Sequence, residues 1–99
     1  MHARTGTFQA DPGQLEAMVD QLRSEQLPHY HEQSGYKGFT VLADRESGKV
    51  IGISFWETEA DLEASDALGR EARERAAQTG GAAGEPVRES FEVMLDDMG

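Results

Sequence analysis

Residues 35–56 read GYKGFTVLADRESGKVIGISFW, and this stretch decides the fold. Two runs rich in β-branched and aromatic residues flank a short polar segment, Arg45–Gly48, and this pattern predicts a β-hairpin. Because the loop is longer than two residues, we expect a bulged turn in which Gly48 has a positive φ angle.

The second run of the hairpin is apolar on both of its faces. One parity carries three large apolar side chains: Ile51, Ile53 and Phe55. The other parity places two small residues between two large ones: Val50, Gly52, Ser54 and Trp56. A strand without a polar face lies inside a sheet that is covered on both sides. We therefore expect this run to be a central strand.

The sequence before the hairpin predicts one strand and one helix. His2–Gln9 has weak alternation with threonines and Phe8, which favours a strand. The helix begins at Asp11, which can cap it, and Pro12 suits the first helical position. Leucine, methionine and valine then recur at helical spacing. We expect Pro28 to bend the helix, which continues to about residue 34.

A second helix and a last strand follow the hairpin. Thr58 and Asp61 have the spacing of a capping box, and a helix is expected from about Glu59 to Thr79. Its apolar face is thin and consists of Leu62, Leu68, Ala72 and Ala76. A glycine-rich linker occupies 80–86, and clean alternation over Val87–Leu95 predicts the last strand.

The order of elements is therefore β-α-β-β-α-β, the ferredoxin-like arrangement of a single α+β domain over residues 1–99. It consists of a four-stranded antiparallel sheet with two helices on one face. Since the central hairpin is apolar on both faces, the uncovered face needs a partner, and a second copy of the chain is the simplest one. We expect a homodimer packed sheet face to sheet face.

Composition excludes several classes of function. The net charge is −10 and the isoelectric point about 4.5, which argues against nucleic-acid and anionic-membrane partners. With no cysteine, the chain can form no disulfide, thiolate zinc site or thiol nucleophile. No apolar run approaches the ~20 residues of a membrane helix, and we expect no signal peptide. A cytoplasmic location is the default expectation.

The chain resembles the antibiotic biosynthesis monooxygenase (ABM) group of dimeric α+β barrels. The matching features are Leu27-Pro28, the Gly35-Tyr36-Lys37-Gly38 start of a strand, the Phe55-Trp56-Glu57-Thr58 end of the next, and the acidic capped helix that follows. This scaffold hosts cofactor-free oxygenases, haem-degrading enzymes and members with no known activity. The resemblance implies a ligand cavity between the sheet and its own helices, with a tryptophan matching Trp56 on its wall.

Two departures from the family bear on cofactors. The resemblance implies that haem-degrading relatives use a histidine on the second helix as iron ligand and an asparagine on the first strand. Here residues 62–68 contain no histidine, and the chain has no asparagine. We therefore expect neither haem nor another cofactor. In cofactor-free relatives, an asparagine amide can stabilise a developing anion, and this amide is missing here. The side-chain amide of Gln9 or of Gln33 is an alternative donor.

Candidate site residues fall into two groups by role. In a helix His29 and His31 point about 200° apart, so no metal site is expected there. His29 or Tyr30 near a cavity would be candidate catalytic groups, His29 as a general base for a phenol; the alternative for the histidines is an exposed, solvated pair. Arg4 is expected to pair with an acidic substrate, with Glu89 or Glu92, or in an ordinary surface pair.

The second group would bind substrate and consists of Trp56, Ser54, Phe8 and Tyr36. Small residues beside the Trp56 ring leave room for a flat apolar ligand, and the alternative is that Trp56 caps the core. Tyr36 either packs at the start of its strand or donates a hydrogen bond in the cavity.

Three functions are compatible with these features. The first is a cofactor-independent monooxygenase acting on a small aromatic, polyketide-like substrate. The second is a non-catalytic small-molecule-binding or accessory dimer, and the third is a haem-degrading monooxygenase. The sequence leaves open whether the protein is an enzyme.

Overall fold

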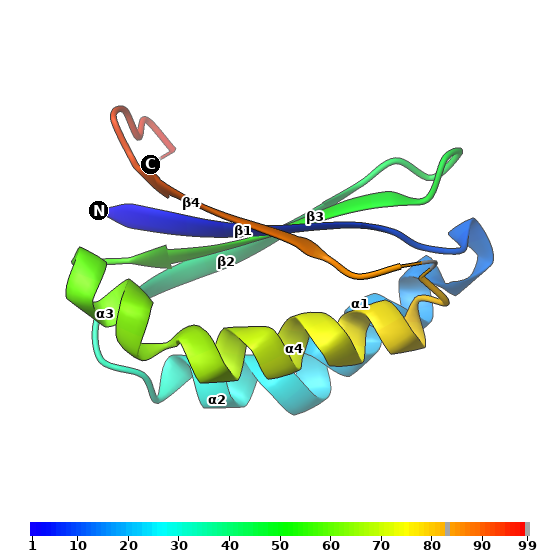
Figure 1. The fold of residues 1–99 in the computed structure, drawn as a ribbon, viewed down its shortest axis with the longest axis horizontal. Coiled ribbons are helices and arrows are strands. Elements are labelled where there is room, and N and C mark those ends of the chain that lie inside the picture. Colours follow the sequence, from blue (N-terminus) through cyan, green and yellow to red (C-terminus); the bar gives the residue numbers. More distant parts are fainter. Residues whose placement is uncertain (83, 99) are drawn as a thin grey trace.

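A four-stranded antiparallel sheet carries the helices on one of its faces (Figure 1). The computed structural model describes residues 1–82 and 84–98. The strands lie in the order β2-β3-β1-β4. In chain order the elements are β1 (His2–Gln9), η1 (Pro12–Gln14), α1 (Leu15–Gln21), η2 (Leu22–Gln26), α2 (Leu27–His31), β2 (Tyr36–Ala43), β3 (Lys49–Trp56), α3 (Glu59–Ala64), α4 (Asp66–Thr79) and β4 (Val87–Glu92). The predicted α+β, ferredoxin-like fold is confirmed.

The hairpin forms where the sequence predicts it. The Asp44 side chain accepts hydrogen bonds from the backbone N–H groups of Glu46 (2.9 Å) and Ser47 (3.3 Å), which fixes the loop. Gly48 has φ +82°, as expected for this bulged turn. A second irregularity lies in β2, where the register shifts between Tyr36 and Gly38.

The strand β3 lies between β1 and β2, which confirms its central position. On the face toward the helices, Val50 and Trp56 are buried. On the opposite face, Ile51, Ile53 and Phe55 are half-buried, and no helix covers them (Figure 1). The sheet therefore has one packed face and one apolar face open to solvent.

The first helical segment widens before Pro28. Its start is as predicted, since the Asp11 carboxylate accepts the N–H of Gly13 (2.9 Å). The wide turn η2 then forms a π-helix, in which the N–H of Leu27 donates to the carbonyl of Leu22. Proline cannot donate to the preceding turn, and the wider turn precedes it. The expected end near residue 34 is wrong, because α2 ends at His31.

The second helix is interrupted, which the sequence did not predict. Thr58 caps α3 by accepting the N–H of Asp61 (3.1 Å). At Ser65 the backbone leaves helical geometry and the hydroxyl donates to the carbonyl of Leu62 (2.7 Å), so a new helix, α4, begins at Asp66. The single helix expected over 59–79 is therefore wrong at Ser65, where the side chain takes over a backbone acceptor.

The last strand is shorter than predicted. β4 ends at Glu92 rather than Leu95, although the N–H of Val93 still donates to the carbonyl of Met1 (2.9 Å). Beyond it, Met94 and Leu95 are 85% and 86% exposed. In the linker over 80–86, Ala83 lies outside the described residues.

Two groups of buried side chains fill the space between the sheet and the helices. One surrounds Met18 and Val50, and the other surrounds Trp56 and Leu62. Small residues of α4, Ala72 among them, are buried against these groups. In the described part of the chain, no helix has the length and apolarity needed to cross a membrane.

Candidate functional site

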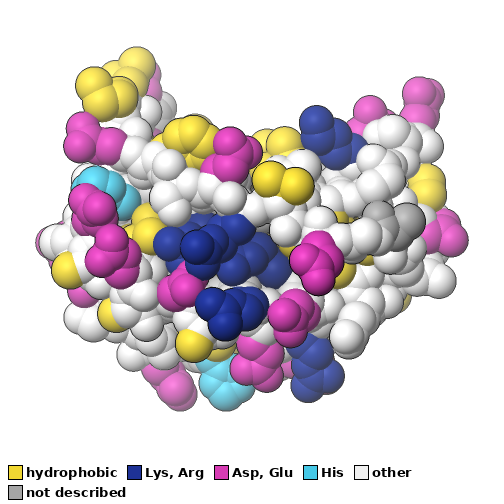
Figure 2. Space-filling view, viewed as in Figure 1, with side chains coloured by type: hydrophobic (Ala, Val, Ile, Leu, Met, Phe, Trp, Pro, Cys, Tyr) yellow, Lys and Arg dark blue, Asp and Glu magenta, His cyan; other side chains and the backbone are white. Residues whose placement is uncertain are grey.

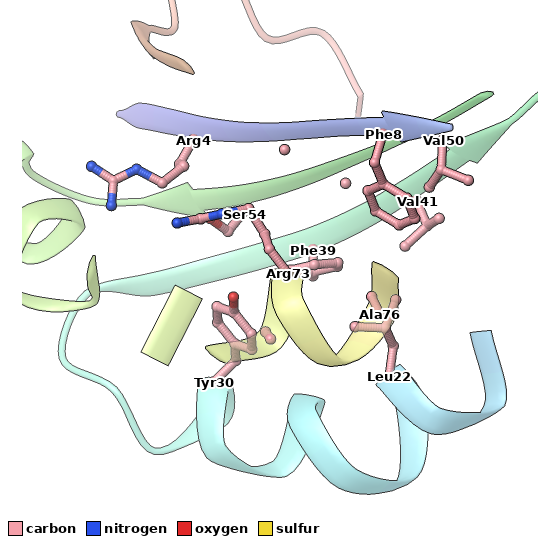
Figure 3. Close-up of a pocket in the computed structure, with 13 residues that line it drawn as sticks. Arg4, Phe8, Leu22, Tyr30, Phe39, Val41, Val50, Ser54, Arg73 and Ala76 are labelled. Carbon is pink, nitrogen blue, oxygen red and sulfur yellow. The ribbon is translucent and has the colours of Figure 1, made fainter. Parts of the chain in front are cut away.

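A cavity lies between the sheet and the helices (Figure 3). The volume that the centre of a water-sized sphere can reach is about 30 Å³, and all the space between the lining atoms, with the open mouth included, is about 420 Å³. The lining side chains come from every strand except β4 and from the helical layer: Arg4, Gly6, Phe8, Leu22, Tyr30, Phe39, Val41, Val50, Gly52, Ser54, Ala72, Arg73 and Ala76. Most of these are apolar, and the polar groups are few.

The cavity exists because small residues face one another across it. Gly6 of β1 pairs with Gly52 of β3 at the centre of the sheet, and Ala72 of α4 lies opposite. A Cβ atom added to Gly52 would make only ordinary contact with the Phe39 ring, at 3.7 Å. The space above Gly52 is therefore bounded by the Phe39 ring rather than filled by it.

Arg73 reaches from α4 across the cavity to the sheet (Figure 3). A Cβ atom on Gly6 would lie 2.5 Å from Cδ of Arg73, so the stem of this arginine rests directly on the glycine. Near Gly69, a Cβ atom would be 3.1 Å from Nη1 of Arg73 and 3.7 Å from the Tyr30 hydroxyl oxygen. The guanidinium and the phenol are thus brought to the same end of the cavity.

Burial keeps the Tyr30 hydroxyl protonated. Tyr30 is 3% exposed, and burial raises its pKa to about 12, although the positive charge of Arg73 acts in the opposite direction. At neutral pH this side chain is therefore a neutral phenol, which can donate a hydrogen bond to a ligand. It is not a ready base.

The structure brings together three of the six catalytic and substrate-binding candidates from the sequence. Tyr30, Ser54 and Phe8 line the cavity. Trp56 has no exposed surface and lies behind Ser54, to which its indole N–H donates (2.9 Å). Tyr36 packs against Trp56 with ring centroids 5.8 Å apart, so it too belongs to the layer behind the wall.

His29 is placed elsewhere. Its side chain is exposed and lies in a surface hollow with Gln26, Leu68 and Glu71, none of which lines the cavity. His31 is also exposed and packs beside Tyr36, at 5.4 Å between ring centroids. In the described residues, no group of three or more His, Asp or Glu side chains is placed to hold a metal ion.

The sequence analysis missed Arg73. In the sequence it is one of several basic residues in an acidic, charged helix. The signal that could have found it is its spacing, because Arg73 follows Gly69 by one helical turn and precedes Ala76 by three residues. That stripe of small residues faces the sheet, so a long side chain within it points into the cavity.

Arg4 has a different partner from the acids considered above. Its buried guanidinium donates from Nη1 to Oδ1 of Asp66 at 2.5 Å and lies 3.4 Å from the Ser90 hydroxyl, so the pairing with Glu89 or Glu92 is wrong. Glu89 is opposite Thr5 and therefore lies on the other face of the sheet from Arg4. Glu92 is opposite His2, two positions along β1 from Arg4.

Asp66 is the acceptor for three arginines. Besides Arg4, it accepts from Arg88 and, at 3.4 Å, from Arg70. Burial pushes the pKa of Asp66 upward, but the hydrogen bond from Arg88 and the charges of Arg4, Arg88 and Arg70 outweigh it and hold the pKa below its usual range. The carboxylate therefore stays ionised and ties α4 to β1 and β4.

We expect Asp66→Asn to lower the free energy of unfolding at pH 7 by about 1–3 kcal/mol, because the buried Arg4 loses its counter-ion. Since the pKa of Asp66 is lower in the folded state, this stabilisation is present above the unfolded value near ~3.9 and is lost as the pH falls through the folded pKa. Urea unfolding from pH 7 to pH 3 should show the wild-type and variant curves converging at the acid end. A constant difference over this range would contradict the assignment.

Comparison with known proteins identifies the family. The antibiotic biosynthesis monooxygenase profile matches residues 1–68, which contain β1, β2, β3 and most of the cavity wall. The chain belongs to the antibiotic biosynthesis monooxygenase family. The ABM resemblance noted in the sequence is thereby confirmed.

Relatives and solved structures agree with this family. Two uncharacterised proteins of Mycobacterium tuberculosis are 31% identical over 93 residues and 34% identical over 77 residues. These matches cover 94% and 78% of this chain but only 41% and 33% of the relatives, so the chain spans less than half of their length.

Among solved structures, a monooxygenase from the ActVA-Orf6 gene of Streptomyces coelicolor, in complex with nanaomycin D, is similar with a TM-score of 0.77 and 20% identity. The alignment covers 99% of this chain and 91% of that one. SnoaB, a cofactor-independent oxygenase from Streptomyces nogalater, has a TM-score of 0.66 and 13% identity over 99% of this chain and 97% of its own. A Nitrosomonas europaea protein of unknown function has a TM-score of 0.72 and 22% identity, over 99% and 93%. At these identities the likeness establishes the fold.

Proposed function

We propose that this ABM-family protein is a cofactor-independent monooxygenase that oxidises a flat, electron-rich aromatic phenol in the cavity. The observation that carries the proposal is the pairing of an apolar cavity with two hydrogen-bond donors at one end, the neutral Tyr30 phenol and the Arg73 guanidinium. Rings such as Phe39 would hold the aromatic part, and the donors would meet an oxygen atom of the substrate.

The reaction that fits this cavity needs no electrons from the protein. Loss of a proton gives the substrate anion, and the charge of Arg73 with the hydrogen bond from Tyr30 would stabilise it. The carbanion form bonds to one atom of O₂, and the resulting peroxide loses water to leave a carbonyl group. One oxygen atom enters the product and the other leaves as water, with both hydrogens supplied by the substrate.

In this proposal Tyr30 is a donor rather than a base. Its pKa of about 12 leaves the proton on the oxygen at neutral pH. His29 takes no part, since it is exposed and outside the cavity. The described lining residues include no carboxylate or imidazole, so the substrate proton would pass to water at the mouth.

The same lack of a base among the described lining residues favours a second candidate, a non-catalytic aromatic-binding protein. Such a protein would use the cavity and the two donors for affinity alone. The two candidates differ in one observable, the consumption of oxygen by a bound substrate.

Oxygen uptake with anthrone, in buffer containing a metal chelator, tests the proposal. We expect uptake above the spontaneous rate, with one O₂ consumed for each anthraquinone formed. Gly52→Val is the matched control, because its side chain would enter the cavity beside Phe39 and should abolish the excess uptake while the protein stays folded. Saturable anthrone binding without uptake would identify the non-catalytic alternative, and no binding would reject both.

We also propose that the protein is a homodimer joined through the open sheet face. That face carries the half-buried Ile51, Ile53 and Phe55 of β3, and Leu42 and Phe91 beside them are each 50% exposed. A sheet face this apolar favours association, and a second copy offers the same surface. The contact would complete the two-sided burial that the hairpin sequence requires.

We expect Ile53→Asp to convert the dimer to a monomer of 10.8 kDa, because dimer formation would bury an unpaired carboxylate. Sedimentation velocity or light scattering gives the mass. Ala67→Asp is the control, since it adds the same charge at an exposed position of α4 away from the sheet. A monomeric wild-type protein, or a dimer that tolerates Ile53→Asp, would contradict the proposed interface.

A further inference from the structure

Four arginine side chains gather on one face of the molecule, where α4 passes beneath β1 and β4. They are Arg4, Arg70, Arg73 and Arg88, here called the arginine cluster. Figure 2 shows the basic side chains at the centre of this face with acidic side chains around them. The chain has a net charge of −10 and only nine Lys and Arg residues, so this grouping runs against its overall charge.

Acidic side chains at the cluster leave part of its charge uncompensated. Asp66 is the carboxylate paired with Arg4, Arg70 and Arg88. Glu74 and Glu85 line the same surface hollow, but neither forms an ion pair with the cluster within the described residues. Arg73 is half-buried and, over the same residues, has no carboxylate within 4.0 Å.

The arginines also oppose one another. Burial lowers the pKa of Arg73, and the nearby charges of Arg4 and Arg88 lower it further, although Tyr30 and Asp66 act in the opposite direction. Arg4 is affected in the same way by its burial and by Arg88, although Asp66 acts in the opposite direction. Like charges held together in a partly buried place cost free energy, which a bound anion would recover.

Arg73 connects this charge to the cavity. It lines both the apolar cavity and the surface hollow that Arg70, Arg88 and Glu74 border. Its stem rests on the sheet at Gly6, and the residue borders both spaces. If the ring system of a ligand occupies the cavity, a substituent that points toward the mouth would therefore lie among the arginines.

We infer that the arginine cluster binds a carboxylate group of the ligand whose aromatic part occupies the cavity. This inference rests on the proposed use of the cavity for an aromatic ligand, and it narrows the substrate class to aromatic acids. A carboxylate suits the site because the planar guanidinium fork donates two parallel hydrogen bonds to it. The hydrogen bonds that Arg4 and Arg88 donate to Asp66 would keep these two arginines in place, while Arg73 contacts the ligand carboxylate directly.

Isothermal titration with two matched probes tests the inference. The first is a dihydroxyanthraquinone carboxylate, and the second is its hydroxymethyl analogue, which has the same ring system without the charge. We expect the carboxylate to bind at least about tenfold more tightly at low salt, and added salt should weaken the binding of this probe alone.

Two variants locate the effect. Arg73→Gln should bring the affinities for the two probes to within about twofold of each other. The loss of the contact between Arg73 and the ring oxygen weakens both probes equally, so it cancels in this ratio. Arg75→Gln is the matched control, because Arg75 is exposed on the same helix and lies by His29 rather than at the cavity. It removes the same charge from the chain and should change neither affinity.

The outcomes separate this inference from the proposed function. Equal affinity of the wild-type protein for the two probes, or a preference that survives Arg73→Gln, overturns the carboxylate site while leaving the aromatic cavity in place. Binding of neither probe overturns both. A preference that depends on Arg73, without oxygen uptake when the corresponding anthrone carboxylate is supplied, upholds the carboxylate site and rejects the monooxygenase.

Discussion

Replacing Trp56 with alanine is expected to lower the free energy of unfolding by about 3–5 kcal/mol. Trp56 has no exposed surface and packs against Tyr30 and Tyr36, with ring centroids 6.1 Å and 5.8 Å away. Alanine would leave a large void among these rings and would also leave the Ser54 hydroxyl without the indole N–H that it accepts. For a domain of this size, each kcal/mol lowers the melting temperature by about 4–8 °C.

Far-ultraviolet circular dichroism should follow this unfolding, because Trp56 is itself the only tryptophan of the chain. Trp56→Phe is the informative control. It keeps an aromatic ring in the core but removes the hydrogen bond to Ser54, so we expect it to cost less than half of the alanine value. A loss below about 1 kcal/mol in the alanine variant would show that Trp56 is not a packed core residue.

Tyr30→Phe is expected to reduce kcat for oxygen-dependent turnover about 100-fold while changing the affinity for substrate by less than about threefold. The ring stays in the aromatic cluster with Phe39, whose centroid is 5.1 Å away, so the fold should be retained. The lost group is a donor placed at the end of the cavity where the substrate anion would form, and a single preorganised donor of this kind is worth about 10²–10³ in kcat.

Tyr36→Phe is the matched control for this prediction. It removes the same hydroxyl group from the same cluster, but Tyr36 does not line the cavity, so kcat should stay within about twofold of wild type. The pH dependence gives a second check. Because the pKa of Tyr30 is about 12, its hydroxyl does not titrate between pH 6 and 9. The pH–rate profiles of the wild-type protein and Tyr30→Phe should therefore have the same shape over this range. Equal kcat values for Tyr30→Phe and wild type would remove Tyr30 from the mechanism.

The hairpin and its surroundings were predictable because their signals are local. The β-branched and aromatic run over Lys49–Trp56, the glycine at 48 and the Asp11-Pro12 helix start depend on the nearest neighbours in the chain. The apolar character of both faces of β3 also predicted its central position. Together these features determined the α+β topology, and the residues at the ends of β2 and β3 carried the ABM resemblance that the family profile confirms.

The interrupted helix shows where local signals fail. Glu59–Thr79 has a helical pattern throughout, yet the helix is interrupted at Ser65, where the hydroxyl donates to the carbonyl of Leu62. The break begins α4 at Asp66, which then reaches Arg4 of β1. No pattern along the sequence specifies that a serine in a helical region will prefer this bond, because the preference depends on how α3 and α4 pack against the sheet.

The sequence by itself determined the topology and the hairpin strand that is apolar on both faces. It also determined a set of aromatic and polar residues on the side of the sheet toward the helices. These features follow from the period of side chains along each strand and helix. Only the tertiary structure decided which of them meet. It places Tyr30 in the cavity and His29 outside it, sets Trp56 behind the wall, and brings Arg73 over Gly6, sixty-seven positions earlier in the chain. The physical reason is that a cavity is defined by the distance and rotation between a helix and a sheet, and those depend on packing across the whole core rather than on neighbours in sequence.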